Sequence, residues 1–135
     1  MIDYTPIGLI HTPHQLPDQT PIQTVYADNS QGWIEVYPDY AEGLADLDGF
    51  SHLYLLYHFH QVKTRQLTVT PYMADHPTGI FATRSPLRPN PIGLSIVELI
   101  RQEGLKLIIN RVDMLDQTPL LDIKPYTRKF DTITP

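Results

Sequence analysis

The segment between Phe81 and Gly93 holds the densest set of side chains able to bind an anion or a nucleotide. It reads FATRSPLRPNPIG, with three prolines within six positions. Each proline fixes φ at about −65° and removes a backbone donor, and each residue before a proline is pushed toward an extended conformation. We therefore expect a rigid loop that is neither helix nor central strand and presents Arg84, Arg88 and Asn90 for bidentate recognition. The alternative is a rigid crossover with solvated arginines.

Three histidines near the middle of the chain form a second candidate group. His58 and His60 are two residues apart and His52 shares their parity, so a strand would place them on one face. A His-x-His pair with a carboxylate can bind a metal. They could equally be polar strand ends satisfied by the backbone or by a ligand. Because no further ligand set has a diagnostic spacing, we expect no metal. For His60 we favour a hydrogen bond to a ligand or a structural role.

The segment from Asp116 to Tyr126 offers a third group of polar side chains. Residues 116–119 read DQTP, the composition of a turn in which Asp bonds its own backbone. One reading is a hairpin connection followed by a strand. In the other, Asp116 and Thr118 bind a polar ligand, and further polar residues gather at the strand end. Asp122 and Lys124 would share a strand face and could pair there.

The segments that would position these residues have the sequence pattern of short strands, with little helix. Residues 50–59 are mostly aromatic or leucine, which suits a strand buried on both faces. Asp39 could cap one short helical turn, residues 14–28 read as a loop, and Gly104 marks a turn. Seven or eight short strands predict an all-β barrel or sandwich, and we expect a compact single-domain barrel over residues 1–135. The expected strands cover residues 6–12, 32–37, 50–59, 67–72, 79–83, 93–100, 105–112 and 120–123.

Bulk composition narrows the class of protein. The 135 residues are 41% hydrophobic, as in globular proteins, and include no cysteine, which excludes disulfides and thiolate nucleophiles. No apolar run approaches the ~20 residues of a membrane span, and the N-terminus has no signal-peptide pattern. We expect a cytoplasmic protein. A net charge of −5 argues mildly against a general nucleic-acid binder, although basic residues cluster in the proline-rich loop and near the C-terminus.

Several motifs in order resemble the TsaA-like (TrmO) family of S-adenosylmethionine-dependent tRNA methyltransferases. The string RSPLRPNPIG is the most specific of them, and together they cover nearly the whole chain. They are PIGLIHTP (6–13), YAEGL (40–44), GFSHL (49–53) continuing to residue 60, residues 81–95, and LDIKPY (121–126).

The resemblance implies a compact β-barrel that acts as a homodimer, with the cofactor site near the subunit interface. It also implies methylation of N6 of threonylcarbamoyl-modified adenosine at tRNA position 37, with S-adenosyl-L-methionine as cofactor. The chain lacks the Gly-x-Gly-x-x-Gly fingerprint of Rossmann-type enzymes, in agreement with such a barrel. The cofactor contacts that it implies are Gln23, His60, Gln61, Arg84, Leu94, Asp116, Gln117, Thr118 and Pro119.

The chain departs from the family pattern in three places. The family commonly reads Asp-Gly-Thr-Pro where Gln117 replaces the glycine here, which would alter the backbone of that turn. Pro21-Ile22-Gln23 lacks an arginine that the early loop often carries. Some members have an extra C-terminal domain thought to help hold tRNA, and this sequence ends at Pro135.

The expected mechanism is an in-line methyl transfer in which the protein positions the reactants and shapes charge. Asp116 or aromatic faces would hold the cationic sulfonium. Asn90, Asp122 and Tyr126 are the candidate catalytic acceptors for the N6 proton. Arg88 and Lys124 would bind substrate, at phosphate or at the carboxylate of the modification.

Two other functions stay open from the sequence. One is a methyltransferase for a different small molecule or RNA. The other is a non-catalytic module that binds S-adenosylmethionine or a nucleotide.

Overall fold

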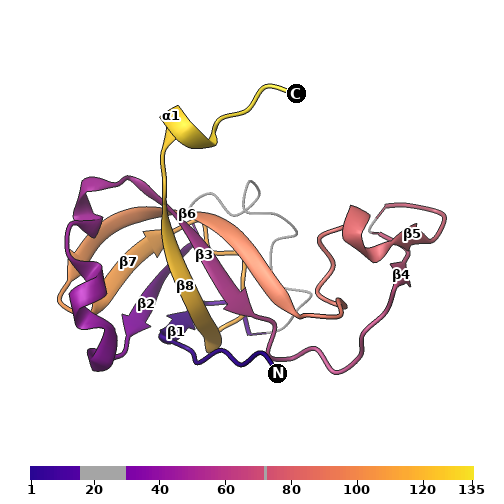
Figure 1. Ribbon diagram of the computed structural model, residues 1–135, viewed down its shortest axis with the longest axis horizontal. Coiled ribbons are helices and arrows are strands. Elements are labelled where there is room, and N and C mark those ends of the chain that lie inside the picture. The colour runs from indigo at the N-terminus through magenta and orange to yellow at the C-terminus, as the bar shows by residue number, and fades with distance from the viewer. Residues whose placement is uncertain (16–29, 72) are drawn as a thin grey trace.

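Strands of alternating burial close into a small barrel in the computed structural model, which describes residues 1–15, 30–71 and 73–135. The barrel order is β1-β2-β7-β6-β3-β8, and all its pairings are antiparallel (Figure 1). Its strands are β1 (Gly8–His11), β2 (Gln31–Val36), β3 (His52–His58), β6 (Ile92–Glu103), β7 (Lys106–Asn110) and β8 (Thr118–Tyr126).

The remaining elements of the described chain are short. Strands β4 (Thr68–Val69) and β5 (Thr78–Gly79) pair in a separate two-stranded sheet. The expected seven or eight strands are thus divided between the barrel and this small sheet. None of the helical segments in the described residues is long and apolar enough to cross a membrane. These segments are the 3-10 helices η3 (Pro38–Leu44), η4 (Leu47–Gly49) and η5 (Ile80–Ala82), and the single-turn helix α1 (Arg128–Asp131).

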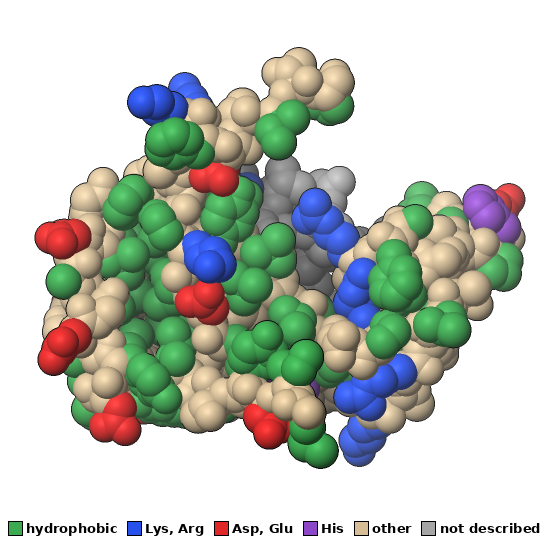
Figure 2. Space-filling view, viewed as in Figure 1, with side chains coloured by type: hydrophobic (Ala, Val, Ile, Leu, Met, Phe, Trp, Pro, Cys, Tyr) green, Lys and Arg blue, Asp and Glu red, His purple; other side chains and the backbone are tan. Residues whose placement is uncertain are grey.

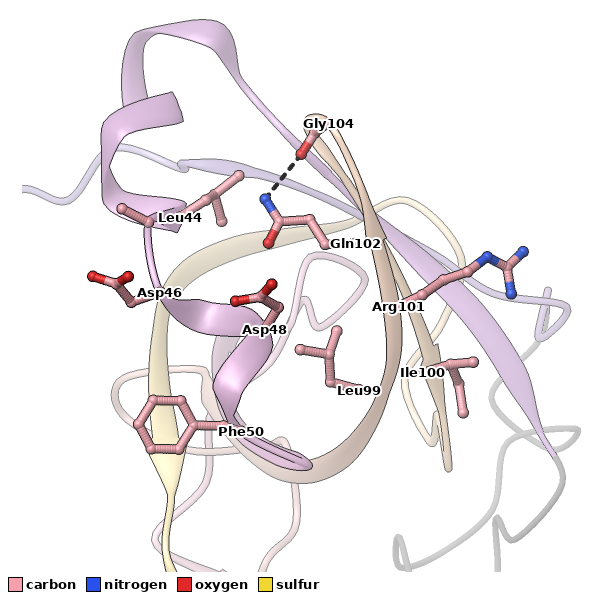
Figure 3. A pocket seen from close by; sticks show the side chains of 10 residues that line it. Leu44, Asp46, Asp48, Phe50, Leu99, Ile100, Arg101, Gln102 and Gly104 are labelled. Carbon is pink, nitrogen blue, oxygen red and sulfur yellow. Dashed lines mark hydrogen bonds between the residues drawn. The ribbon is translucent and has the colours of Figure 1, made fainter.

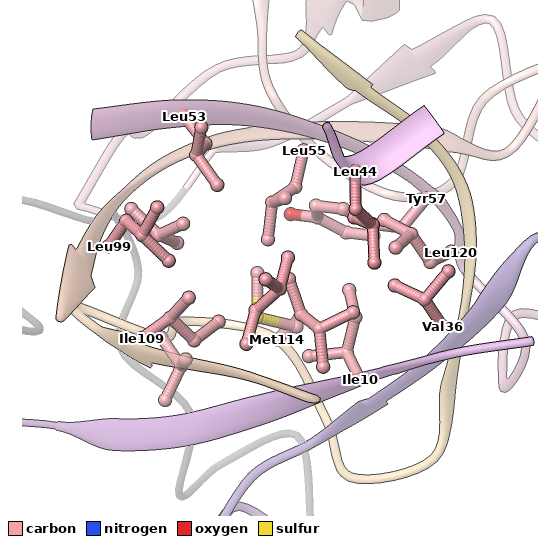
Figure 4. Packing of buried hydrophobic residues seen from close by; sticks show 14 residues of the cluster. Ile10, Val36, Leu44, Leu53, Leu55, Tyr57, Leu99, Ile109, Met114 and Leu120 are labelled. Carbon is pink, nitrogen blue, oxygen red and sulfur yellow. The ribbon is translucent and has the colours of Figure 1, made fainter. Parts of the chain in front are cut away.

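Each barrel strand gives one face to the core. In β3, Leu53, Leu55 and Tyr57 point inward, whereas the residues between them are partly exposed. The expectation that this segment is buried on both faces is therefore wrong, because a closed barrel has only one interior. The core fills the barrel with aliphatic side chains from every strand (Figure 4).

Two other local expectations are corrected. Residues 79–83 do not form a strand: β5 ends at Gly79, and the chain then turns through η5, where Thr83 N donates to Ile80 O at 3.1 Å. Asp39 lies in the first turn of η3 but does not cap it. Tyr37 is the N-cap residue and makes no side-chain cap bond, and Pro38 suits the helix start because it has no backbone N–H that needs an acceptor. Gly104 makes the expected turn, with φ +63°. The loop expected at residues 14–28 lies almost wholly outside the described residues.

A long excursion between β3 and β6 projects from the barrel and is here called the arm (residues 59–91). Figure 1 shows it extending sideways, with β4 and β5 at its tip. Backbone bonds join its two legs: Phe59 N to Pro91 O (2.8 Å), Gln66 N to Leu87 O (3.1 Å) and Ile80 N to Leu67 O (2.9 Å). The arm is therefore a braced hairpin, although little of it is regular strand.

A bulge in β8 decides which side chains reach the outer surface. Leu120 pairs with Tyr57 and points inward, whereas Asp122 pairs with Leu56, so Leu121 is the extra residue. Because of this extra residue, even-numbered positions of β8 face the core before the bulge and face outward after it. As a result, Asp122, Lys124 and Tyr126 follow the outer face.

One buried polar chain crosses the barrel wall. The Tyr57 hydroxyl donates to Ser95 Oγ at 2.7 Å, and Ser95 Oγ donates to Asp113 Oδ1 at 2.7 Å. Burial, and secondly the charge of Asp113, raise the pKa of Tyr57, so this phenol stays protonated as the first donor. Its ring lies against Gly93, where an added Cβ would come within 2.2 Å of Tyr57 Cε2.

The close contact between Gly93 and the ring of Tyr57 leads to a prediction about stability. Gly93→Ala should lower the free energy of unfolding by ~1–3 kcal/mol, because the methyl group would overpack against a buried ring that cannot move away. Urea unfolding followed by tryptophan fluorescence measures it. Gly49→Ala is the matched control, since its Cβ would meet nothing within 4 Å. Equal stability of the two variants would contradict the assigned contact.

Candidate functional site

A cavity of about 1030 Å³ lies on the outer side of the barrel, where β3 and β6 meet the proline-rich loop and the end of β8. Its walls combine aromatic rings, aliphatic side chains and three arginines: Arg84 from the arm, Arg111 after β7 and Arg128 from α1. Positive charge around an apolar floor suits an organic anion or a nucleotide. The lining residues are Ser51, His52, Tyr54, Arg84, Leu94, Ser95, Ile96, Arg111, Tyr126 and Arg128.

Aromatic side chains form one wall of this cavity. The ring of Tyr126 lies edge-on to two other rings. The centroid distance is 5.6 Å to Tyr54 and 6.2 Å to His52. Desolvation, and then the charge and hydrogen bond of Asp131, raise the pKa of Tyr54, so it remains a neutral hydroxyl. Asp131 also accepts from Thr127 N at 2.8 Å, which fixes α1 beside the cavity.

The proline-rich loop is braced by its own side chains. Phe81 and Ala82 belong to η5, and Ile92 and Gly93 to β6, so the irregular part is shorter than expected, residues 83–91. Within it, Arg88 Nη1 donates to Thr83 O at 2.8 Å and Ser85 O at 3.2 Å. Arg88, which the sequence predicted to bind substrate, thus holds the shape of the loop that carries Arg84.

The predicted catalytic and substrate residues of β8 lie together on its outer face. Lys124 Nζ is 3.3 Å from Asp122 Oδ2, which confirms the expected pairing of these side chains. Asp122 Oδ1 accepts from Ile123 N at 2.8 Å, so the carboxylate is held at both oxygens. Tyr126 lies farther along the strand, in the cavity wall. Asn90 is exposed at the end of the proline-rich loop.

A second group of predicted residues gathers where β1 ends and β8 begins. The turn at Asp116 is fastened to the segment after β1: Thr12 N donates to Asp116 Oδ1 at 2.9 Å, and Asp116 N to His14 O at 2.8 Å. Desolvation opposes ionisation of Asp116, but the bonds from Thr12, Gln117 and Gln15 outweigh it and lower its pKa. The carboxylate therefore stays charged and can attract a cation.

Gln117 adopts the left-handed conformation, φ +66°, that glycine reaches most easily. Its side-chain nitrogen lies 3.1 Å from Nδ1 of His11, and His11 stacks on Trp33 with centroids 3.8 Å apart. The turn thus keeps a glycine-like backbone although a larger side chain occupies it. Beside it, Thr118 is buried and donates to Leu115 O at 2.6 Å, and Pro119 pairs with Leu9 in the β1–β8 ladder.

His60 belongs to this second group. It follows the end of β3, so it does not share the strand face of His52 and His58. Desolvation, and then the neighbouring His58, lower its pKa; interactions with Asp116 oppose the shift. His60 is therefore neutral at pH 7. Gln61 beside it is exposed, and Gln23 lies outside the described residues. Within those residues no group of three or more potential ligands could hold a metal ion.

The structure thus places the predicted site residues in two groups and adds residues that the sequence did not single out. Arg84, Leu94 and Tyr126 line the cavity, whereas His60, Asp116 and Gln117 lie at the β1–β8 end. Arg111 carries no local sequence signal, and Arg128 belongs only to the basic cluster expected near the C-terminus; the fold brings both to the cavity. The stack of His11 on Trp33 could not be predicted either, because the two residues come from different strands.

A smaller cavity of about 550 Å³ lies toward the far end of β6 (Figure 3). Asp46, Asp48 and Phe50 line it together with Leu99 and Gln102, whose amide donates to Gly104 O at 3.2 Å. It contains none of the predicted site residues, so the larger cavity remains the candidate site.

Comparison with known proteins identifies the family. The tRNA-methyltransferase O N-terminal domain matches residues 9–132. A probable S-adenosyl-L-methionine-binding protein of Pyrococcus abyssi is 53% identical over 97% of this chain and 71% of its own length. The tRNA (adenine(37)-N6)-methyltransferase of Escherichia coli is 35% identical over 89% of this chain and 55% of its own length. The crystal structure of TrmO from Pseudomonas aeruginosa superposes with a TM-score of 0.80, at 34% identity, over 98% of this chain and 59% of that one.

The chain therefore spans little more than half of the Escherichia coli and Pseudomonas aeruginosa proteins but most of the Pyrococcus abyssi one. The matched domain covers nearly all of the described barrel and arm, and the structural match extends over both. This chain belongs to the TrmO family of tRNA methyltransferases.

Proposed function

We propose that residues 1–135 form one TrmO-type domain that methylates N6 of threonylcarbamoyl-adenosine at position 37 of tRNA, using S-adenosyl-L-methionine. The main support for the proposal is that Arg84, Leu94 and Tyr126 line the same cavity. Two of them are predicted cofactor contacts, and the third is a predicted catalytic residue. The names of the bacterial and archaeal relatives supply the cofactor and the class of substrate. We also propose that the protein is cytoplasmic.

The residues present suit the charges of the cofactor. The guanidinium of Arg84 fits a carboxylate, and the rings of Tyr54 and Tyr126 offer faces to a cation or an adenine. Asp116 is held as an anion and His60 as a neutral ring, so the β1–β8 group favours a positive charge. When bound, S-adenosylmethionine supplies an electrophilic methyl group on a cationic sulfur.

The residues of β8 would act on the substrate. Methylation replaces the single hydrogen on N6 of the modified adenine by the methyl group, so a proton must be accepted. Asp122 is oriented for this by Ile123 N and Lys124. Asn90 would fix the base by hydrogen bonds, and the Tyr126 hydroxyl would be the third polar contact. Lys124 and Arg88 would bind a phosphate or the carboxylate of the modification.

We further propose that the site is completed in a homodimer. The predicted cofactor residues lie in two groups, and the outer barrel face between them is apolar. Leu56 on β3 and Ile92, Leu94 and Ile96 on β6 form this face, with Leu94 57% and Ile92 40% exposed. Figure 2 shows the hydrophobic side chains gathered over the barrel. Monomers rarely leave so continuous an apolar area exposed, and a second copy would cover it.

The central test is methyl transfer from labelled S-adenosylmethionine to tRNA from a strain that lacks the activity. Arg84→Ala should weaken cofactor binding about 10- to 100-fold, because a charge-assisted contact is lost. Asn90→Ala and Asp122→Ala should lower kcat about 100-fold or more with unchanged cofactor affinity by calorimetry. Glu103→Ala, remote from the cavity, is the control.

Near-normal rates for both variants would remove Asn90 and Asp122 from the mechanism. Equal rates on tRNA with and without the threonylcarbamoyl group would favour a different substrate. Four archaeal relatives are named only for S-adenosylmethionine binding, which keeps a non-catalytic binding module as the second candidate function. Cofactor binding without any methyl transfer would decide for that candidate.

The lowered pKa of His60 predicts how cofactor affinity depends on pH. Above its ordinary value of about 6.5 the ring is neutral, and it stays neutral somewhat below that value. Protonation then places a second cation near the sulfonium, so cofactor affinity should be flat from pH 8 to 6.5 and fall at lower pH. His60→Gln should flatten this profile, whereas His76→Gln on the arm tip should keep it. An unchanged profile in His60→Gln would refute the role.

The dimer proposal predicts the effect of charge on the apolar face. Ile92→Glu should convert a dimer to monomers in sedimentation velocity, because a carboxylate buried without a partner is strongly unfavourable. Ile2→Glu also replaces an exposed isoleucine and should leave the dimer intact. A monomeric wild type, or a dimeric Ile92→Glu protein, would show that this face is not the interface.

A further inference from the structure

Charge is distributed very unevenly along this acidic chain. All ten lysines and arginines lie at or beyond residue 63, whereas residues 1–62 contain eight aspartates and glutamates. The arm carries four basic residues and one acidic residue, a net charge of +3 on a chain of −5. Figure 2 shows basic side chains along the arm and acidic ones on the opposite edge of the barrel. The field of the protein is therefore polarised, with its positive end at the arm.

The basic side chains come from both legs of the arm and lie in one section of it. Arg65 Nε donates to Pro89 O at 3.0 Å, and Gln66 N donates to Leu87 O. These bonds place the leg with Lys63 and Arg65 directly beside the proline-rich loop. The basic residues of the arm therefore include Lys63 and Arg65 on one leg and Arg84 at the rim of the cavity on the other.

An aromatic ring projects from the same arm. Phe81 is 78% exposed although its backbone is fixed in η5, between buried Ile80 and the capping bond of Thr83. Among the described residues no other aromatic ring contacts it, and it does not belong to the hydrophobic core. A ligand that covered this ring would remove its apolar surface from water, which is favourable.

Cations beside an exposed aromatic ring are the combination that binds single-stranded nucleic acid. The cations contact phosphates, and the ring stacks on an unpaired base of any type. An apolar protein surface would also cover Phe81 and Leu67, whose carbonyl accepts from Ile80 N, but it would give no role to the basic residues of the same arm. The rest of the chain carries a net charge of −8, so the arm is the part of the molecule best suited to phosphate contacts beyond the one proposed for Lys124.

We propose that the arm is the RNA-binding element of this protein: Lys63 and Arg65 contact loop phosphates, and Phe81 stacks on an unpaired base next to the target adenine. This rests on the proposed function, which makes a tRNA loop the substrate. The arm then holds the loop while the cavity below Arg84 receives the reacting base.

The test measures RNA affinity and salt dependence separately from catalysis. A fluorescein-labelled RNA hairpin with a seven-nucleotide loop serves as the probe in anisotropy titrations of the full chain. Phe81→Ala should weaken binding about tenfold, since a base–aromatic stack is lost, and Phe81→Tyr should restore it. Leu67→Ala, at an equally exposed apolar residue (70%), should change affinity less than about twofold.

Lys63→Gln should reduce the slope of log affinity against log salt by about 0.7, the value for one phosphate contact on a single strand. Calorimetric titration of S-adenosylmethionine should give the same affinity in all these variants. Thermal unfolding of each variant verifies that the arm remains folded.

The proposal would be overturned if the wild type did not bind the RNA, or if Phe81→Ala bound it with wild-type affinity. It would also be overturned if Leu67→Ala lost as much affinity as Phe81→Ala, or if Lys63→Gln left the salt slope unchanged. A further contrary result would be a Phe81→Ala protein whose dimer dissociates. The last would make Phe81 a protein contact. The proposed function fails differently, in the methyl-transfer assay. Active methylation with unaffected arm variants rejects the arm alone, and RNA binding through the arm without methylation rejects the catalytic role alone.

Discussion

The pairing of β3 with both β6 and β8 is the constraint on which the rest of the structure depends. This strand contributes Leu53, Leu55 and Tyr57 to the core, and its outward residues to the sheet face beneath the cavity. Because the barrel closes around one interior, every side chain on the outward face is available for something other than core packing. The apolar character of that face is therefore not explained by folding, and both the cavity and the proposed dimer draw on it.

Local irregularities in the strands determine which polar groups accompany this face. The bulge at Leu121 places Asp122, Lys124 and Tyr126 outside, whereas an unbroken β8 would point them into the core, where an ion pair is strongly disfavoured. Gly93 allows β6 to cross the ring of Tyr57 closely, and the next residues, Leu94 and Ser95, line the cavity. Stability and site geometry are thus fixed by the same few backbone positions.

Much of this could be predicted from the sequence, because alternation and turn residues are local signals. The barrel strands, the Gly104 turn and the Asp122–Lys124 pair follow from spacing alone. Two kinds of feature could not be predicted. The faces of β3 depend on closure of the barrel, which a run of aromatic and leucine residues does not reveal. The place of Arg111 and Arg128 in the cavity depends on tertiary contacts between segments distant in the chain. Residues 80–82 form η5 in place of the expected strand, and this turn closes on itself through the bond from Thr83 N to Ile80 O.

An acidic protein that acts on tRNA must solve an electrostatic problem, since phosphate repulsion from the body opposes approach from most directions. Placing four of the ten cations on a projecting arm with one acidic residue would solve it, because interactions between exposed charges are largely screened beyond a Debye length of about 8 Å at physiological salt. At that range the acidic residues of η3 and η4, on the far part of the barrel, are screened from a ligand at the arm, and those near the cavity are tied up with Lys124 or with backbone donors. The same polarity would orient an approaching polyanion before contact, with the arm first and the acidic barrel end away from it. A net charge of −5 is therefore compatible with an RNA substrate, because the positions of the ten cations matter more for binding than their number.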